Sequence, residues 1–298
     1  MKMNNINKCI EILNDLGADA LLLCNEANMH YICGFSPSEG MILIFKNGDS
    51  YHLVDSRYTE IAIQHAKESS LKVLEITKRF SEHVADIFNE HGAKSLVFEN
   101  ETISYSTYNA VKNAISSAEL INLDNRLMLY RNRKEAEEIV FMKKANQIAE
   151  KSFLELLNDV KPGKTEKELA AEFEYIMAKN GSDGISFDTI LLSGAHTSMP
   201  HGVPSENTIK SGDFVLFDFG ATFNGYHSDM TRTVAVGSAT DEMISAYNLV
   251  LSAQKAGIKA LNAGVKCADV YKAAYDVLDK ENMAQYFRHG LGHGVGLE

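Results

Sequence analysis

The sequence has few basic residues for its length. It carries 29 Lys and Arg against 40 Asp and Glu, which gives a formal net charge of −11 and a pI near 5.4. Nucleic-acid surfaces and anionic membranes are bound by clustered Lys and Arg that neutralise phosphates. The composition therefore counts against both kinds of partner.

Long hydrophobic runs are also absent. No stretch approaches the roughly 20 apolar residues of a membrane span, and residues 1–8 contain no apolar core of signal-peptide length. We therefore expect a cytoplasmic protein without a membrane partner.

Cysteine is scarce, and its spacing forms no C-x-x-C pair. The four cysteines lie in or beside apolar segments, where a thiol usually behaves as a small hydrophobic side chain; they are Cys9, Cys24, Cys33 and Cys267. We expect them to be reduced and structural.

What is present is enough apolar sequence for two domains, because 45% of the 298 residues are hydrophobic. Up to about Leu123, short apolar strands alternate with amphipathic helices, beginning with a helix from Ile6 that stops at Gly17. Asn47-Gly48 predicts a hairpin turn. The predicted strands are residues 20–23, 41–45, 51–54, 73–76 and 96–98.

A polar, basic stretch near residues 125–133 marks the domain boundary, which we place between residues 126 and 127. A long amphipathic helix follows and ends before Pro162-Gly163. A second helix begins at Thr165, where Thr165 and Glu168 form a predicted capping box. Gly181 is predicted to end it.

A weak internal repeat organises the second domain. Residues 160–165 and the helix after them match residues 261–266 and their helix at a constant offset of 101 positions. Two generic amphipathic helices after glycine loops would explain the match less well, because long helices also precede both segments. The repeat predicts two equivalent helix pairs.

Two carboxylates mark the candidate site. Asp218 interrupts the apolar run Phe214–Gly220, which reads as a strand buried on both faces, and a buried carboxylate is costly unless it is paired or binds a metal. Asp229 lies on the next predicted strand, residues 226–236, after the turn at Asn224-Gly225. Two turn registers are open, and they make the aspartates either directly opposed or diagonal. Both place them on one face at about 5 to 8 Å between Cβ atoms, where like charges share a proton or hold a cation.

Histidines add candidate ligands. His289 and His293 lie among four glycines, which let the backbone approach a ligand closely, and a neutral imidazole is a common metal ligand. His201 follows Pro200 in a loop, where it could hydrogen-bond a carbonyl oxygen. His196 and His227 are interpreted as surface or supporting residues, and Thr231 and Thr233 as residues that could orient the carboxylates.

These residues resemble the creatinase, aminopeptidase P and prolidase family. Asp218-Phe219-Gly220, with Asp229 eleven positions after the first aspartate, resembles the double-aspartate signature, and residues 289–294 resemble the histidine signature. Pro200-His201-Gly202 resembles a third element, on the substrate side. Residues 28–35 and 54–59 look like the amino domain of that family, so the resemblance spans essentially the whole chain.

The resemblance implies a fold and a metal site. The fold is α/β (α+β): a creatinase-type N-terminal domain at residues 1–126 and a pita-bread catalytic domain with an internal pseudo-two-fold repeat at residues 127–298. Two divalent ions are implied, with Mn expected and Zn or Co as alternatives. By the resemblance Asp218 binds one ion, Asp229 bridges both and His293 binds the other, while His201 and His289 contact the substrate.

The implied activity is metal-dependent hydrolysis of the peptide bond that precedes proline, by an Xaa-Pro aminopeptidase or dipeptidase, in a protein expected to form a homodimer. The chain departs from the family pattern because two glutamate ligands and a further histidine would lie beyond Glu298. We therefore expect a pita-bread domain that is incomplete at its C-terminus, with weak metal binding and little activity. The alternative is a non-catalytic pita-bread module that binds peptides or proteins, and creatinase-like amidinohydrolase chemistry is a third interpretation.

Overall fold

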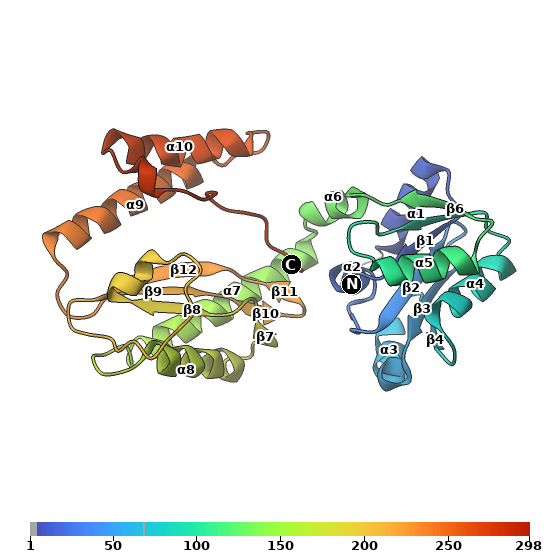
Figure 1. Cartoon of the computed structure of the whole chain (residues 1–298), viewed down its shortest axis with the longest axis horizontal. Coiled ribbons are helices and arrows are strands. Elements are labelled where there is room, and N and C mark those ends of the chain that lie inside the picture. Colours follow the sequence, from blue (N-terminus) through green and yellow to red (C-terminus); the bar gives the residue numbers. More distant parts are fainter. Residues whose placement is uncertain (1–4, 68) are drawn as a thin grey trace. The chain divides into compact units, whose positions relative to one another are not determined.

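The computed structural model describes residues 5–67 and 69–298, so the first four residues of the N-terminal segment considered above lie outside the described residues. The chain forms two compact units (Figure 1). One extends to Val140 and includes Asn224–Tyr226 and Gly296–Glu298; the other contains Phe141–Phe223 and His227–Val295. The expected boundary between residues 126 and 127 falls at the start of helix α6 (Arg126–Asn132).

The first unit is built on a six-stranded mixed sheet with the order β4-β3-β2-β1-β5-β6. β2 pairs antiparallel with both β1 and β3, and the other pairs are parallel. The strands are β1 (Ala20–Leu23), β2 (Gly40–Phe45), β3 (Ser50–Val54), β4 (Lys72–Glu75), β5 (Ser95–Phe98) and β6 (Glu119–Asn122). The predicted hairpin joins β2 to β3, with Gly48 at a φ of 93°. β6 is not among the strands predicted from the sequence.

Helices cover this sheet because their apolar faces match its alternating side chains. α4 and α5 bury Val84, Phe88 and Val111 against Leu43 and Leu96 of the sheet. α1 ends at Gly17, whose φ of 65° is the left-handed cap that the glycine predicts. The helices are α1 (Ile6–Leu16), α2 (Glu26–Cys33), α3 (Thr59–Ala66), α4 (Phe80–Glu90) and α5 (Tyr105–Ala114), with a 3-10 turn at Ser56–Tyr58.

In the second unit, α8 (Glu166–Lys179) and the part of α7 (Ala136–Leu156) from Phe141 onward pack on one face of the antiparallel sheet β12-β9-β8 (Figure 1). Phenylalanine rings fill the interface: Phe219 stacks on Phe153 at 5.5 Å between ring centroids and lies 4.6 Å from Phe173. The strands are β8 (Ile190–Ser193), β9 (Phe214–Phe219) and β12 (Met230–Ala235). A second small sheet, β11-β10-β7, contains Tyr226–His227, Ala221–Phe223 and Gly184–Ile185.

The expectation that residues 214–220 form a strand buried on both faces is wrong. Val215, Phe217 and Phe219 of β9 are fully buried against α7 and α8, but Phe214, Leu216 and Asp218 on the other face are only partly buried. The core covers one face alone, and Asp218 lies on the face that remains accessible. Its side chain is therefore partly accessible to solvent.

The two helix pairs that the repeat predicts are present. α10 (Cys267–Lys280) begins and ends 101 positions after α8, and α9 (Asp241–Ala260) precedes it as α7 precedes α8. The capping box is confirmed at α8, where the Thr165 hydroxyl accepts from the Glu168 N–H and the Glu168 carboxylate accepts from the Thr165 N–H. α10 has no side-chain cap at Lys266. The two halves of the repeat therefore share the positions of their helices, but only α8 has side-chain hydrogen bonds at its N-terminal cap.

The four cysteines are unpaired thiols. Cys9 and Cys33 are buried and Cys24 is partly buried, but Cys267 is exposed at the first residue of α10. Burial raises the pKa of the Cys33 thiol to about 12, which suits a structural residue. The prediction of an apolar setting for all four cysteines is wrong for Cys267.

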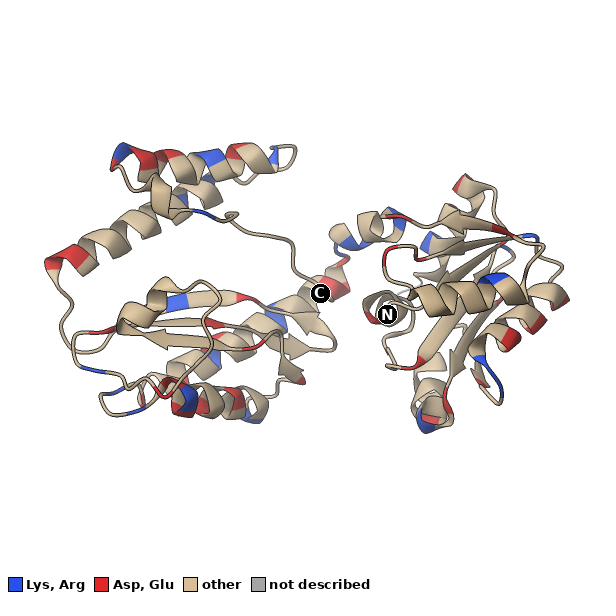
Figure 2. Cartoon of the chain, viewed as in Figure 1, with Lys and Arg blue, Asp and Glu red and all other residues tan. Residues whose placement is uncertain are grey.

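Charged residues of both signs are interspersed along both units, as Figure 2 shows for the described part of the chain. In the same part, no helix is long and apolar enough to cross a membrane.

Candidate active site

The hairpin that carries the two aspartates adopts one of the two predicted registers. Thr231 of β12 pairs with Asp218 of β9, so Asp229, two residues earlier, is the diagonal neighbour of Asp218. Asn224 and Gly225 are central in the turn and both have positive φ, 48° and 74°, as a type I′ turn requires. The hairpin therefore brings both carboxylates to one face.

The predicted continuous strand over residues 226–236 is broken just before Asp229. β11 ends at His227 and β12 begins at Met230. At the break, the Ser228 hydroxyl accepts a hydrogen bond from the Ala221 N–H at 2.9 Å. A Cβ atom on Gly220 would lie 1.9 Å from the Ser228 carbonyl oxygen. The close approach of these two backbones requires glycine at position 220, and Asp229 lies immediately before the first residue of β12.

Asp218 is partly buried beside another negative group. Burial raises the pKa of its carboxyl, and the Asp229 carboxylate raises it further, while the Thr231 hydroxyl and the imidazoles of His201 and His293 act to lower it. The Thr231 Oγ1 donates to Asp218 Oδ1 at 2.7 Å, which confirms the predicted orienting role of Thr231. A cation between the carboxylates would offset both the cost of burying the Asp218 charge and the repulsion between the two carboxylates.

His293 faces Asp229. Its Nε2 lies 3.1 Å from Asp229 Oδ2, and its Nδ1 lies 2.9 Å from the Gly294 carbonyl oxygen. Because a carbonyl oxygen only accepts, Nδ1 carries a proton, and Nε2 is the atom directed at the carboxylate. That arrangement, with the outer nitrogen bonded to a backbone carbonyl, is the one found around metal-ligating imidazoles.

The other two predicted residues are placed differently. His201 is exposed in a turn closed by a 3.0 Å hydrogen bond from the Gly202 N–H to the Met199 carbonyl oxygen, and it influences Asp218 electrostatically. His289 is also exposed; its ring lies edge-on to Phe287 at 4.9 Å between centroids, and its Nδ1 lies 2.7 Å from the Gly290 carbonyl oxygen. The described contacts of His289 therefore do not involve the aspartates.

The donor chemistry fits a divalent ion, because carboxylates and imidazole are ligands of Mn, Zn and Co. Within residues 5–67 and 69–298, however, no three His, Cys, Asp or Glu side chains converge on one point as a ligand set. Asp218, Asp229 and His293 therefore carry suitable donor atoms and lie close to one another, but they do not form a complete set of metal ligands.

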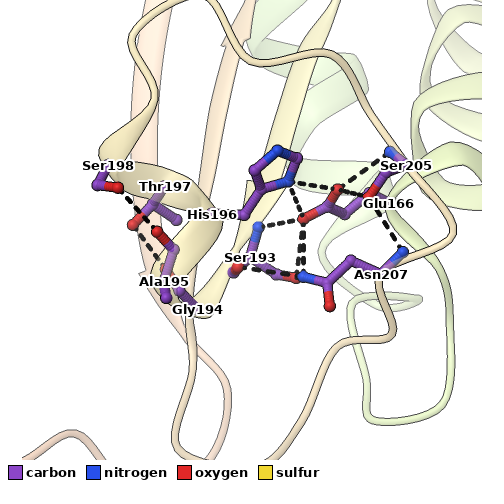
Figure 3. Close-up of polar contacts among 9 residues, drawn as sticks. All are labelled: Glu166, Ser193, Gly194, Ala195, His196, Thr197, Ser198, Ser205 and Asn207. Atoms are coloured by element: carbon purple, nitrogen blue, oxygen red, sulfur yellow. Dashed lines mark hydrogen bonds and ion pairs between the residues drawn. The ribbon is translucent and has the colours of Figure 1, made fainter.

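The second unit also contains a buried carboxylate that was not predicted from the sequence to have a role. Glu166, the first residue of α8, is 0% exposed, and its oxygens accept hydrogen bonds from Ser193, His196, Ser205 and Asn207 (Figure 3). The only signal was an acidic residue in a first helical turn, which is common and favourable without any further role. His196 was interpreted as a surface or supporting residue, and it supports Glu166.

Burial acts to raise the pKa of Glu166, but hydrogen bonds from Asn207, Ser205 and Ser193 outweigh it and lower the pKa to about 2. Since the folded pKa lies below the unfolded value near 4.5, the ionised group stabilises the fold by about 3 kcal/mol above that value. This contribution is lost as the pH falls towards 2.

We predict that the difference in unfolding free energy between the wild type and Glu166→Gln shrinks by about 2 kcal/mol between pH 6 and pH 3. Urea unfolding of both proteins across this range measures the difference. A difference that stays constant with pH would show that Glu166 is not ionised with a depressed pKa.

The two carboxylates on this hairpin and the neighbouring imidazole are donor groups that divalent metal ions accept. The chain belongs to metallopeptidase family M24, which matches residues 140–298, and residues 5–134 match the creatinase/prolidase N-terminal domain. The resemblance and the two-domain fold with a pita-bread domain are thereby confirmed.

Relatives of known structure extend over nearly the whole chain. An Xaa-Pro dipeptidase from Bacillus anthracis is 37% identical with a TM-score of 0.92, covering 99% of this chain and 82% of that one. An X-Pro aminopeptidase from Thermotoga maritima is 34% identical with a TM-score of 0.91, covering 98% and 82%. An uncharacterised Bacillus subtilis peptidase, YqhT, is 36% identical over 98% of this chain and 82% of its own length.

Proposed function

We propose that this protein hydrolyses the peptide bond that precedes proline, as an Xaa-Pro dipeptidase or aminopeptidase that uses two divalent metal ions. The observation that carries the proposal is the grouping of Asp218, Asp229 and His293 on and beside one hairpin, with Asp229 and His293 3.1 Å apart. The proposed preference for proline rests on the similarity to the Xaa-Pro dipeptidase from Bacillus anthracis and the X-Pro aminopeptidase from Thermotoga maritima.

In this proposal the residues have distinct tasks. Asp218, Asp229 and His293 would hold the two ions, and the Thr231 hydroxyl keeps the Asp218 carboxylate in its orientation. Bound metal ions supply Lewis acidity, which polarises the peptide carbonyl and lowers the pKa of water. His201 and His289 contact the substrate, and an imidazole N–H directed at the carbonyl oxygen stabilises the charge that develops there.

Mn as the metal and a homodimer as the assembly are finer features that rest on the family resemblance, whereas the cytoplasm as the location rests on the hydropathy of the sequence. Reconstitution with single metals and the mass of the protein in solution test the first two.

The test is peptide hydrolysis by the protein expressed from its complete reading frame. Metal-free protein is reconstituted with Mn, Zn or Co and given Ala-Pro, Ala-Pro-Ala and, as the matched control, Ala-Ala. We expect cleavage of a proline peptide and not of Ala-Ala, and the preferred length separates dipeptidase from aminopeptidase. Tight binding of these peptides without hydrolysis under any metal would contradict the proposal and favour the non-catalytic module.

A further inference from the structure

The Glu166 carboxylate lies at the start of α8 and has no role in the chemistry proposed above. A fully buried carboxylate is costly unless hydrogen bonds satisfy it. Glu166 Oε1 accepts from the Ser193 N–H at 2.7 Å and from Asn207 Nδ2 at 3.1 Å, and Oε2 accepts from the Ser205 N–H at 3.0 Å and its hydroxyl at 2.8 Å. The partners satisfy both oxygens.

These partners lie at both ends of one loop, as Figure 3 shows. Ser193 ends β8, where the loop leaves the sheet, and Ser205 and Asn207 lie where it returns. The backbone of α8 also binds the returning segment, because the Glu166 N–H donates to the Asn207 carbonyl oxygen at 3.1 Å and the Lys167 N–H to that of Ser205 at 3.2 Å. One side chain thus clamps the loop at residues 194–204 on both sides.

His196 fastens the loop between its ends. Its Nδ1 lies 2.9 Å from Glu166 Oε2 and 3.1 Å from Oε1. An ionised carboxylate only accepts, so Nδ1 donates, and His196 adds a charge-assisted contact to Glu166. The contact holds the 3-10 turn Gly194–Ser198 against α8.

The same loop carries His201. Directly after the 3-10 turn, the chain forms the Met199–Gly202 turn, and a Cβ on Gly202 would lie 2.7 Å from the Leu192 side chain of β8. The turn therefore packs closely on the strand that pairs with β9, where Ile190 is the partner of Asp218. Anchoring of residues 194–204 fixes where His201 lies relative to Asp218.

We propose that Glu166, with His196, is a positioning residue: it holds the 194–204 loop so that His201 reaches the substrate beside Asp218. The inference rests on the proposed function for the role of His201, whereas the anchoring of the loop rests on the contacts of Glu166 alone. Loss of the clamp is expected to misplace His201 and to lower kcat more than it raises KM, because His201 acts on charge that develops during the reaction.

Four variants test the proposal. Glu166→Gln removes the negative charge that accepts the hydrogen bonds. His196→Leu removes the contact between His196 and Glu166 at a position that is only partly buried. His196→Asn keeps an N–H donor near the place of Nδ1. Glu168→Gln is the matched control, because it makes the same chemical change in the same helical turn but contacts Thr165 and not the loop.

Steady-state kinetics with the cleaved proline peptide and hydrogen exchange of residues 194–204 are measured on each. We expect Glu166→Gln and His196→Leu to lower kcat by about 10- to 100-fold, the cost of a small misplacement, and to speed exchange in the loop. We expect His196→Asn to keep kcat and the exchange rate of the loop near their wild-type values, and Glu168→Gln to change neither quantity. Unchanged loop exchange in Glu166→Gln and His196→Leu, or an equal loss in Glu168→Gln, would overturn the proposal.

A double variant separates positioning from general stability. If Glu166 acts through His201, Glu166→Gln added to His201→Ala lowers kcat no further than His201→Ala alone. A double variant whose kcat falls by the product of the two single-variant factors would contradict the proposal. A wild type that cleaves no proline peptide would refute the proposed function, and the exchange measurement would still decide whether Glu166 holds the loop.

Discussion

Replacing Asp229 with asparagine is expected to lower kcat/KM for proline peptides by well over 100-fold, because even groups that only support metal ligands cost about 10- to 100-fold when removed. Asp229 is the diagonal neighbour of Asp218 and lies 3.1 Å from His293, so it connects the other two candidate ligands. Asparagine keeps the size of the side chain and removes the charge. Bound metal should fall together with activity.

The control for this variant is Asp276→Asn, which removes a carboxylate from an exposed ion pair with Lys272 on α10. Exposed pairs of this kind contribute little, so activity and metal content should stay at wild-type values. Metal content by mass spectrometry and peptide kinetics check both variants. An Asp229→Asn protein with wild-type turnover would remove Asp229 from the metal site.

Gly220→Ala is expected to destabilise the protein by about 3 kcal/mol or more, because the added Cβ would meet the backbone and a rigid neighbourhood rather than a flexible side chain. It would lie 1.9 Å from the Ser228 carbonyl oxygen and 2.7 Å from the Ser186 side chain. The hairpin can relieve the clash only by separating Gly220 from Ser228, which would move Asp218 and Asp229 apart. Activity should fall even in the fraction that stays folded.

Thermal or urea unfolding measures the loss, with Gly184→Ala as the matched substitution. There the added Cβ would lie 3.4 Å from Thr222 Oγ1, an ordinary contact, and the change in stability should stay within about 1 kcal/mol. Equal stabilities of the two variants would show that the approach of Gly220 to Ser228 does not constrain the hairpin.

The sequence predicts those parts of the fold that local chemistry determines. Gly17 ends α1, Thr165 and Glu168 cap α8, and Asn224-Gly225 turns the hairpin of the site. Strand β6 escaped prediction because it presents only Leu120 and Ile121 between polar residues at the edge of the sheet. An edge strand is recognised through its pairing with β5, which a local pattern does not contain.

The candidate site was predictable where spacing along a hairpin decides it, as for Asp218, Asp229 and Thr231. It was not predictable where tertiary contacts decide it. Glu166 gains its importance from loop residues 27 to 41 positions away, and the break at Ser228 depends on the approach of Gly220. One-sided burial of β9 likewise follows from where α7 and α8 lie, which periodicity within the strand does not reveal.

The most direct test of the account is a titration of the metal-free protein, from its complete reading frame, with Mn, following bound metal and proline release in the same samples. Hydrolysis should rise with metal occupancy, and Asp218→Asn and Asp229→Asn should lose metal and hydrolysis together. Hydrolysis that persists in chelator, or metal binding that survives in both variants, would contradict the assignment of this hairpin as the metal centre of the peptidase.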